Sequence, residues 1–192
     1  MPHLRLVKIC AYWKGPVVAL GLLAICPSLA QAADRCGLNY RRLGLPPLVL
    51  QETEYTCGAA CLVSLVKQLS GKELKESHVA AVIGANRSVG TTPEKMVRGL
   101  GLLGFTAKAR DRQGLKALRS NFQRKKGQIL LVQSGDTAHW VVLADYSGGK
   151  ITVMDPWREN KGYLTYSEKE FLALWDTSLL GRKVNQLSLV IE

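Results

Sequence analysis

The stretch Gln51-Glu52-Thr53-Glu54-Tyr55-Thr56-Cys57-Gly58 is the most informative part of this 192-residue chain. Beyond it, apolar residues recur at the spacing of one helix face, at Leu62, Leu65, Val66 and Leu69. Gly71 then closes the pattern, as glycine commonly does at a helix end. The sequence therefore predicts a helix over residues 57–69 whose first residue is a cysteine. Gln51 precedes that cysteine by six residues.

A second informative region carries a histidine and an acid on neighbouring strands. His139-Trp140-Val141-Val142 opens one apolar strand, and Asp155-Pro156 follows the next strand along the chain. Between the two strands, Ser147-Gly148-Gly149-Lys150 has the composition of a hairpin turn. We expect the register of this hairpin to bring Asp155 beside the imidazole of His139.

Together these residues supply the parts of a thiol acyl-transfer site. A helix start and a nearby imidazolium favour the reactive thiolate form of a cysteine, which makes Cys57 the candidate nucleophile and His139 its base. Asp155 would orient the imidazole. The Gln51 amide would stabilise the oxyanion together with the Cys57 backbone N–H. Each residue also has a structural alternative: a buried core cysteine, a structural histidine at a strand start and a turn-opening Asp-Pro.

The N-terminus has the pattern of an export signal. A basic leader is followed by an uncharged apolar run over residues 17–25 and by Ala30-Gln31-Ala32, a small-x-small cleavage pattern. We expect residues 1–32 to be a cleaved signal peptide and the protein to be periplasmic. An uncleaved N-terminal membrane anchor is the alternative. Residues 33–192 then form one domain, with residues 33–47 as an irregular lead-in.

The chain is strongly basic, with a formal charge of +11. Without the leader, 23 basic and 15 acidic residues give residues 33–192 a charge of +8. The densest basic run, residues 119–126, overlaps the helically spaced apolar residues Leu115, Leu118 and Phe122. This pattern is typical of the solvated face of an amphipathic helix rather than of a phosphate-binding stripe. We therefore expect no nucleic-acid partner, and a membrane contact only if the leader is retained.

Residues 33–192 contain three cysteines, Cys36, Cys57 and Cys61. An odd number of cysteines in an oxidising compartment leaves at least one thiol without a partner in the same chain. A disulfide between Cys36 and Cys61 would leave Cys57 free, whereas a bridge between Cys57 and Cys61 within one helical turn would distort the backbone. The cysteines lack zinc-site spacing, so no metal or cofactor is expected.

The order of elements predicts an α+β fold. Besides residues 57–69, helices are expected over residues 73–83, 93–103, 115–122 and 167–175. After a first strand at residues 105–109, strands are expected at residues 128–133, 139–146, 150–154, 163–166 and 184–191. Helices come first and antiparallel strands follow, which places a helical part against a C-terminal sheet.

The combined motif resembles the C39 family of papain-like cysteine peptidases. The resemblance rests on Gln51 six residues before Cys57, the string Cys57-Gly58-Ala59-Ala60-Cys61-Leu62, and the interval from His139 to Asp155. It implies a papain-like fold, with Cys57 as nucleophile, His139 as base, Asp155 as orienting acid and Gln51 as oxyanion donor. Exporter domains of this family cut after a double glycine and face the cytoplasm, whereas the leader here predicts export.

We therefore predict an exported cysteine endopeptidase that cleaves a secreted polypeptide through a Cys-His-Asp triad. Its substrate is expected to be cut at Gly-rich sites or to belong to a secretion system for fibre-forming or amyloid-like proteins, whose components are candidate partners. Two alternatives stay open. One is a papain-like amidase of peptidoglycan peptides, and the other is a non-catalytic C39-like module that binds a secretion substrate.

Overall fold

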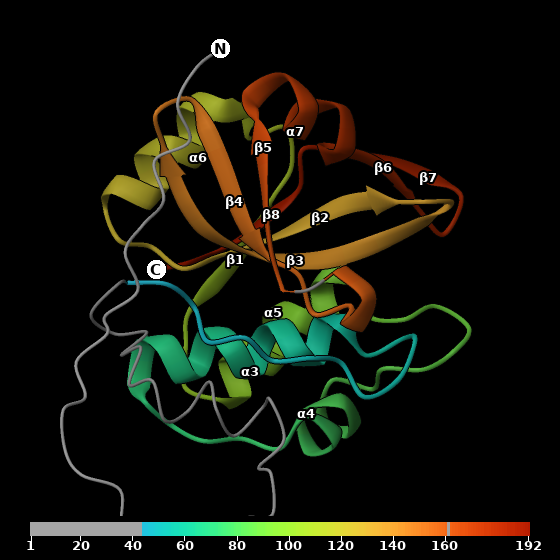
Figure 1. Ribbon diagram of the computed structural model, residues 1–192. Helices are drawn as coiled ribbons and strands as arrows, with labels where there is room; N and C mark the ends of the chain where they lie inside the picture. Colours follow the sequence, from blue (N-terminus) through green and yellow to red (C-terminus); the bar gives the residue numbers. More distant parts are fainter. Residues whose placement is uncertain (1–43, 161) are drawn as a thin grey trace, which may run out of the picture. The chain divides into compact units, whose positions relative to one another are not determined.

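The computed structural model describes residues 44–160 and 162–192, which form three layers (Figure 1). Helices α3, α4 and α5 cover one face of an antiparallel sheet, and α6 and α7 cover the other. The predicted signal peptide and most of the predicted lead-in lie outside the described residues. The helices are α3 (Cys57–Ser70), α4 (Glu76–Val82), α5 (Pro93–Leu102), α6 (Gly114–Gln123) and α7 (Glu168–Trp175).

The main sheet has six strands in the order β1-β8-β2-β3-β4-β5, with every neighbouring pair antiparallel. Its centre is built by the consecutive strands β2, β3 and β4, which are joined by tight turns. The strands are β1 (Ala107–Arg110), β2 (Gln128–Ser134), β3 (Thr137–Ser147), β4 (Lys150–Met154), β5 (Tyr163–Ser167) and β8 (Ser188–Ile191). The predicted α+β class and its antiparallel sheet are confirmed.

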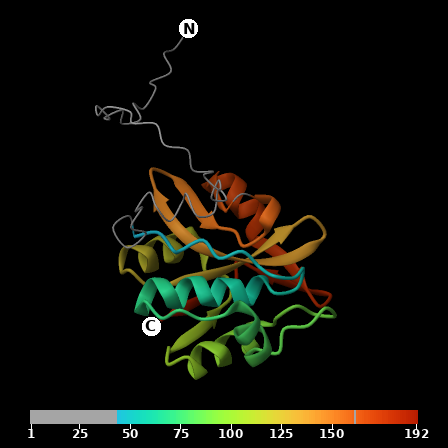
Figure 2. The same cartoon turned by 60° about the horizontal axis from the view of Figure 1, so that its bottom comes forward.

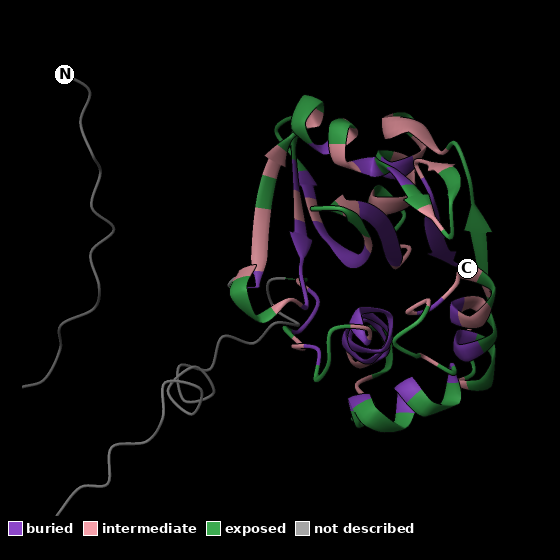
Figure 3. Ribbon diagram, turned by 90° about the vertical axis from the view of Figure 1, so that its right-hand side faces the viewer, coloured by how far each residue is buried: buried purple, intermediate pink, exposed green. Residues whose placement is uncertain are grey.

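The central strands are apolar on both faces because helices cover both sides. Successive side chains of a strand point to opposite faces. Trp140 and Val142 of β3 accordingly pack in the core beneath α3, whereas Val141 and Leu143 pack in the core beneath α6 and α7. Figure 3 shows buried residues along the strands and along α3. The sheet therefore lies between two helical layers and two apolar cores.

Helix α3 lies in the core of the molecule, and its residues from Cys57 to Val66 are all buried. Thr56 is its N-cap residue, but the Thr56 side chain makes no capping hydrogen bond. At the other end Gly71 adopts φ 74° and its N–H bonds to the carbonyl of Lys67, the left-handed closure that glycine makes easily. The helix therefore starts with an uncapped N-terminus at Cys57.

The chain that enters α3 runs back along the helix (Figures 1 and 2). Ser64 Oγ donates to the carbonyl of Pro47 at 2.6 Å, and Gln68 Nε2 donates to the carbonyl of Gly44 at 2.7 Å. This segment therefore belongs to the folded domain. Within the described residues, no helix combines the length and apolar composition needed to cross a membrane.

Most predicted elements are confirmed with shifts of a few residues at their ends. Thr92 caps α5 by accepting a hydrogen bond from the Lys95 N–H at 3.4 Å, with Pro93 as the first helical residue. Ser167 and Glu170 form a reciprocal capping box at the start of α7. The second predicted helix is shorter than expected, because α4 begins only at Glu76.

The prediction of one final strand over residues 184–191 is wrong. A separate hairpin, β6 (Asp176–Leu179) with β7 (Arg182–Asn185), precedes the short strand β8. The break falls at Gln186, which has φ 50° and donates its N–H to the carbonyl of Trp175 at 2.9 Å. Because the chain turns back toward α7 at this point, residues 182–185 cannot continue into the main sheet.

Candidate active site

Cys57 is the first residue of α3, and its side chain is 7% exposed. Gly58 follows where α3 packs tightly on the loop before α5. A Cβ on Gly58 would lie 2.8 Å from Met96 Sδ and 3.2 Å from Thr91 Cβ. The small residue after the cysteine therefore allows the start of α3 to approach this loop and α5 closely.

His139 and Asp155 form a buried pair at one end of the central strands. His139 Nε2 lies 2.8 Å from Asp155 Oδ1, and both side chains are largely buried. The same carboxylate accepts hydrogen bonds from the Trp157 N–H and from Asn160 Nδ2, each at 2.8 Å. The predicted pairing of His139 with Asp155 is thus present. Asn160 helps to orient the carboxylate, but no sequence motif surrounds it from which this role could be predicted.

A β-bulge in β3 places the two side chains on one face of the sheet. Pairing shifts by one residue between Leu143 and Asp145, so that Met154 lies opposite Val142. The next residue, Asp155, then falls level with Val141, which shares a face with His139. Without the bulge, Asp155 would point to the opposite face. The irregularity is therefore what joins the acid to the imidazole.

The electrostatics of the pair favour a charged imidazole. Burial lowers the pKa of His139, but hydrogen bonds with Asp155 and with Cys57, and the negative charges of these partners, raise it to about 9. Burial raises the pKa of Asp155, but the hydrogen bond and charge of His139, with those from Trp157 and Asn160, bring it below its usual value. Since Nε2 faces Asp155, Nδ1 is the ring nitrogen left for Cys57.

Gln51 is buried and tied to the segment after Asp155. Its N–H donates to the carbonyl of Pro156 at 2.9 Å, and its carbonyl accepts from Arg158 Nε at 3.2 Å. The Gln51 side-chain Nε2 donates to the carbonyl of Thr53 at 2.7 Å, which leaves its second N–H for another acceptor. Gln51 does not line the cleft that contains Cys57. The backbone of Gln51 is therefore anchored to the segment that follows Asp155. Its side-chain amide points instead to the backbone of Thr53, two residues further along the chain.

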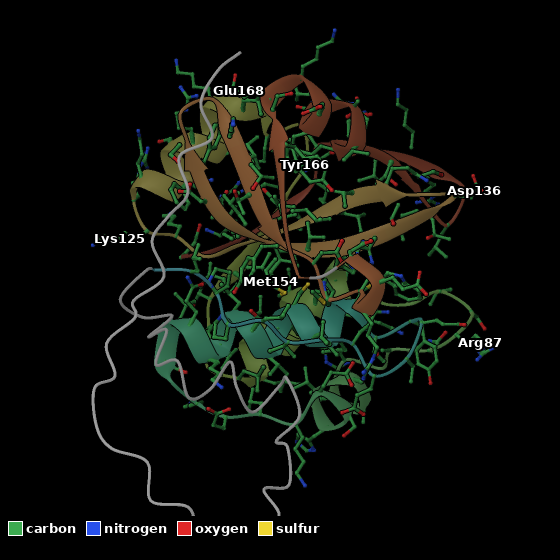
Figure 4. The ribbon with its side chains drawn as sticks, viewed as in Figure 1. Arg87, Lys125, Asp136, Met154, Tyr166 and Glu168 are labelled. Atoms are coloured by element: carbon green, nitrogen blue, oxygen red, sulfur yellow. The ribbon has the colours of Figure 1, made fainter. Side chains whose placement is uncertain are left out.

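Cys57 and His139 open into a cleft of about 730 Å³. Its walls come from the loop before α5, the turn between β2 and β3 and the tip of the β6–β7 hairpin. Arg87 and Asp136 lie on the helical side and the sheet side of its open end (Figure 4). Trp157 lines this cleft, whereas Trp140 is a core residue whose Nε1 donates to the Thr91 carbonyl at 2.9 Å.

Cys61 lies one helical turn after Cys57 and is completely buried. It is a free thiol whose Sγ donates to the carbonyl of Trp140 at 3.2 Å. Burial, followed by the charges of Cys57 and Asp155, raises the pKa of the Cys61 thiol well above its usual value. Cys36 lies outside the described residues, so a bond between Cys36 and Cys61 stays a prediction, and the inward position of Cys61 disfavours it.

Metal-ligating side chains do not cluster at this site. Over residues 44–160 and 162–192, no three or more His, Cys, Asp or Glu side chains lie close enough together to hold a metal ion.

A central helix that begins with a cysteine, packed on an antiparallel sheet that carries a histidine–aspartate pair, defines a papain-like cysteine peptidase. The chain belongs to the Peptidase C39 family, whose model matches residues 46–186. It is therefore a cysteine-type peptidase, a hydrolase. The match includes the β6–β7 hairpin.

Comparison with individual proteins finds one relative in sequence and two solved structures with a similar fold. An uncharacterized protein of Methanothermobacter marburgensis is 33% identical over 114 residues, which is 59% of this chain and 74% of that protein. The peptidase domain of Streptococcus ComA, a bifunctional ABC transporter in a quorum-sensing pathway, aligns with a TM-score of 0.59 at 18% identity, over 75% of this chain and 96% of that domain. A double-glycine-motif protease from an AMS/PCAT transporter, solved with its leader peptide, aligns with a TM-score of 0.56 at 19% identity, over 76% of this chain and 90% of that one.

Proposed function

We propose that this peptidase is an exported endopeptidase in which Cys57 is the nucleophile, His139 the general base and acid, and Asp155 the residue that orients the imidazole. The observation that carries the proposal is the position of His139. Its ring is hydrogen-bonded to a buried carboxylate through Nε2 and interacts with Cys57 on its other side. An imidazole held in this way can keep a proton next to a thiolate.

The reaction follows the order expected for a thiol peptidase. The Cys57 thiolate adds to the carbonyl carbon of the scissile bond, and the carbonyl electrons move to oxygen. When this tetrahedral intermediate collapses, the imidazolium of His139 gives its proton to the departing amine, which leaves a thioester on Cys57. Neutral His139 then takes a proton from water as it attacks the thioester. Collapse of this second tetrahedral intermediate breaks the C–S bond, expels the Cys57 thiolate and releases the acid product, which restores the thiolate beside the imidazolium.

Two groups would stabilise the negative oxygen of the intermediate. The Cys57 N–H lies at the uncapped start of α3, where backbone donors and the helix dipole favour an anion. The second donor would be the N–H of Gln51 Nε2 that the Thr53 carbonyl does not use. For Gln51 to reach the oxyanion, its side chain has to turn toward the cleft when a substrate binds.

The proposed substrate is a secreted polypeptide with small residues at the cut. Three glycines, Gly90, Gly135 and Gly181, line the cleft, and all three adopt positive φ. Backbone without side chains supports binding of an extended chain that lies close to the cleft walls. Export rests on the leader sequence alone, because residues 1–32 lie outside the described residues.

The test is to incubate the purified protein with proteins of the same secretion route and to identify new N-termini by mass spectrometry. Cleavage by the wild-type protein that is lost in Cys57→Ala supports the proposal. If no polypeptide is cut but new N-termini appear in peptidoglycan fragments, the protein is an amidase instead. If neither substrate is cut although the protein is folded, the module is non-catalytic and the proposal is wrong.

A further inference from the structure

The carboxyl group of Glu76 is buried behind the turn that leads into the active-site helix. Glu76 is the first residue of α4, and only 6% of it is exposed. Its Oε2 has no hydrogen-bond partner among the described residues. A buried carboxyl without a cation costs stability. Well-packed apolar residues in place of buried charges are often neutral or stabilising, so the fold alone gives no reason for a glutamate here.

The contacts of Glu76 all lead to residues 52–56. Its Oε1 accepts a long hydrogen bond from the Glu52 N–H at 3.5 Å. Burial raises the pKa of the Glu76 carboxyl, and the neighbouring Thr56 side chain, directly before Cys57, lowers it. Glu76 therefore bonds to one end of a five-residue turn, next to Gln51, and lies beside the other end, next to Cys57.

Inside this turn, the carbonyl of Thr53 gathers three donors. It accepts from Gln51 Nε2 at 2.7 Å, from Thr56 Oγ1 at 3.1 Å and from the Thr56 N–H at 3.3 Å. The Thr53 N–H in turn donates to Thr56 Oγ1 at 3.0 Å. The Thr56 hydroxyl is therefore used inside the turn, which explains why it does not cap α3.

We propose that Glu76 is a positioning residue that holds the 52–56 turn and, through it, the Gln51 amide relative to the Cys57 N–H. The inference rests on the proposed function, since it assigns Glu76 to the oxyanion-binding half of the site. It does not assign Glu76 any contact with the substrate. A buried carboxyl that bonds to the backbone next to Gln51 limits how far Gln51 can move when its side chain swings toward an oxyanion.

Two probes separate this half of the site from the thiol and imidazole. Iodoacetamide alkylates a thiolate without forming an oxyanion, so its rate at Cys57 reports on the thiolate and its imidazolium. Acetyl-glycyl-glycinal adds reversibly to a thiol: the sulfur bonds to the aldehyde carbon, and the former carbonyl oxygen becomes an oxyanion. Its dissociation constant therefore also reports on the oxyanion donors.

For Glu76→Ala we expect the aldehyde to bind about 10- to 100-fold more weakly, while the alkylation rate stays within about twofold of the wild type. Glu76→Gln keeps an acceptor for the Glu52 N–H and should restore most of the affinity. Glu73→Ala, an exposed glutamate just before α4, is the matched control and should change neither measurement. Thr56→Val removes the hydroxyl at nearly constant volume and should weaken aldehyde binding to a similar extent. This variant is used in place of Glu76→Ala if Glu76→Ala does not fold.

Unchanged aldehyde affinity in both Glu76→Ala and Thr56→Val would overturn the assignment. So would an equal loss of aldehyde affinity and alkylation rate that Glu76→Gln does not rescue, because that pattern indicates only a structural role. A different result marks failure of the proposed function itself: wild-type Cys57 would then alkylate slowly and would not bind the aldehyde.

Discussion

The two halves of the site differ in how completely their polar atoms are used. On the sheet side, Asp155 accepts three hydrogen bonds and His139 is held from both sides. On the helix side, Gln51 Oε1, Glu76 Oε2 and Thr91 Oγ1 are buried without hydrogen-bond partners among the described residues. Native proteins leave few such atoms, so each one calls for a functional or solvent explanation. The sheet side is thus already arranged for proton transfer, whereas the helix side has polar groups available to a substrate or to water.

Loss of the imidazole should have the largest effect. For His139→Ala we expect peptide cleavage to fall about 10⁴-fold or more, because both the base and the leaving-group acid are removed. The measurement is kcat/KM on any polypeptide that the wild-type protein cleaves. His78→Ala is the control, since His78 is exposed on α4 and should have no effect. Substantial cleavage by His139→Ala would refute the assigned base.

The buried carboxylate should come next. Asp155→Asn keeps the shape of the side chain but removes the charge that raises the pKa of His139. It also presents an amide to the donors of Trp157 and Asn160. We expect cleavage to fall about 10³-fold, because the imidazole loses both its orientation and its positive charge. A histidine pKa that stays near 9 in this variant, measured by NMR, would contradict the role given to Asp155.

On the helix side, Gln51→Ala should cost less. Removal of one oxyanion donor lowers kcat by about 10²-fold in comparable sites, while the second donor at Cys57 persists. The KM should change little, because Gln51 does not line the cleft in the absence of substrate. If kcat is unchanged and only stability falls, Gln51 serves the turn and not the oxyanion, and the helix-side assignment fails.

The pH profile tests the sheet side without mutation. His139 has its pKa raised from 6.5 to about 9, so the stabilisation from its protonated form is fully present below pH 6.5 and is lost as the pH rises through 9. Activity that needs the imidazolium should fall about tenfold per pH unit above that point. The unfolding free energy of the wild type minus that of His139→Ala should shrink over the same interval. A difference that grows with pH would contradict this charge state.

Much of the sheet side could be predicted from the sequence, because a hairpin brings residues at the far ends of its two strands close together in space. Glycines in the turn and apolar strands on either side place the ends of β3 and β4 next to each other. The face on which Asp155 emerges was not predictable. It depends on the bulge between Leu143 and Asp145, where buried apolar residues continue on both faces and leave no break in the pattern.

The helix side was predicted less completely, since its contacts join residues far apart in the chain. The spacing of apolar residues predicts α3 and its start at Cys57, because helical periodicity is a local property. The contact of Glu76 with residues 52–56 depends instead on how α4 packs beside α3. The β6–β7 hairpin was missed for a related reason: its residues alternate little, and the break at Gln186 is fixed by Trp175.

The smallest effect is expected at Cys61, where the helix side is fully packed. Cys61→Ala removes one buried sulfur and its bond to the Trp140 carbonyl, which should cost about 1 kcal/mol of unfolding free energy and leave cleavage unchanged. If Cys61 were instead bonded to Cys36, either Cys61→Ala or Cys36→Ala would cost about 2–5 kcal/mol, and reducing agent would lower the melting temperature of the wild type. Urea unfolding of both variants, with peptide mapping under non-reducing conditions, separates the two. Because the Cys61 thiol points into the core toward β3, we expect the smaller cost for Cys61→Ala and no cost for Cys36→Ala.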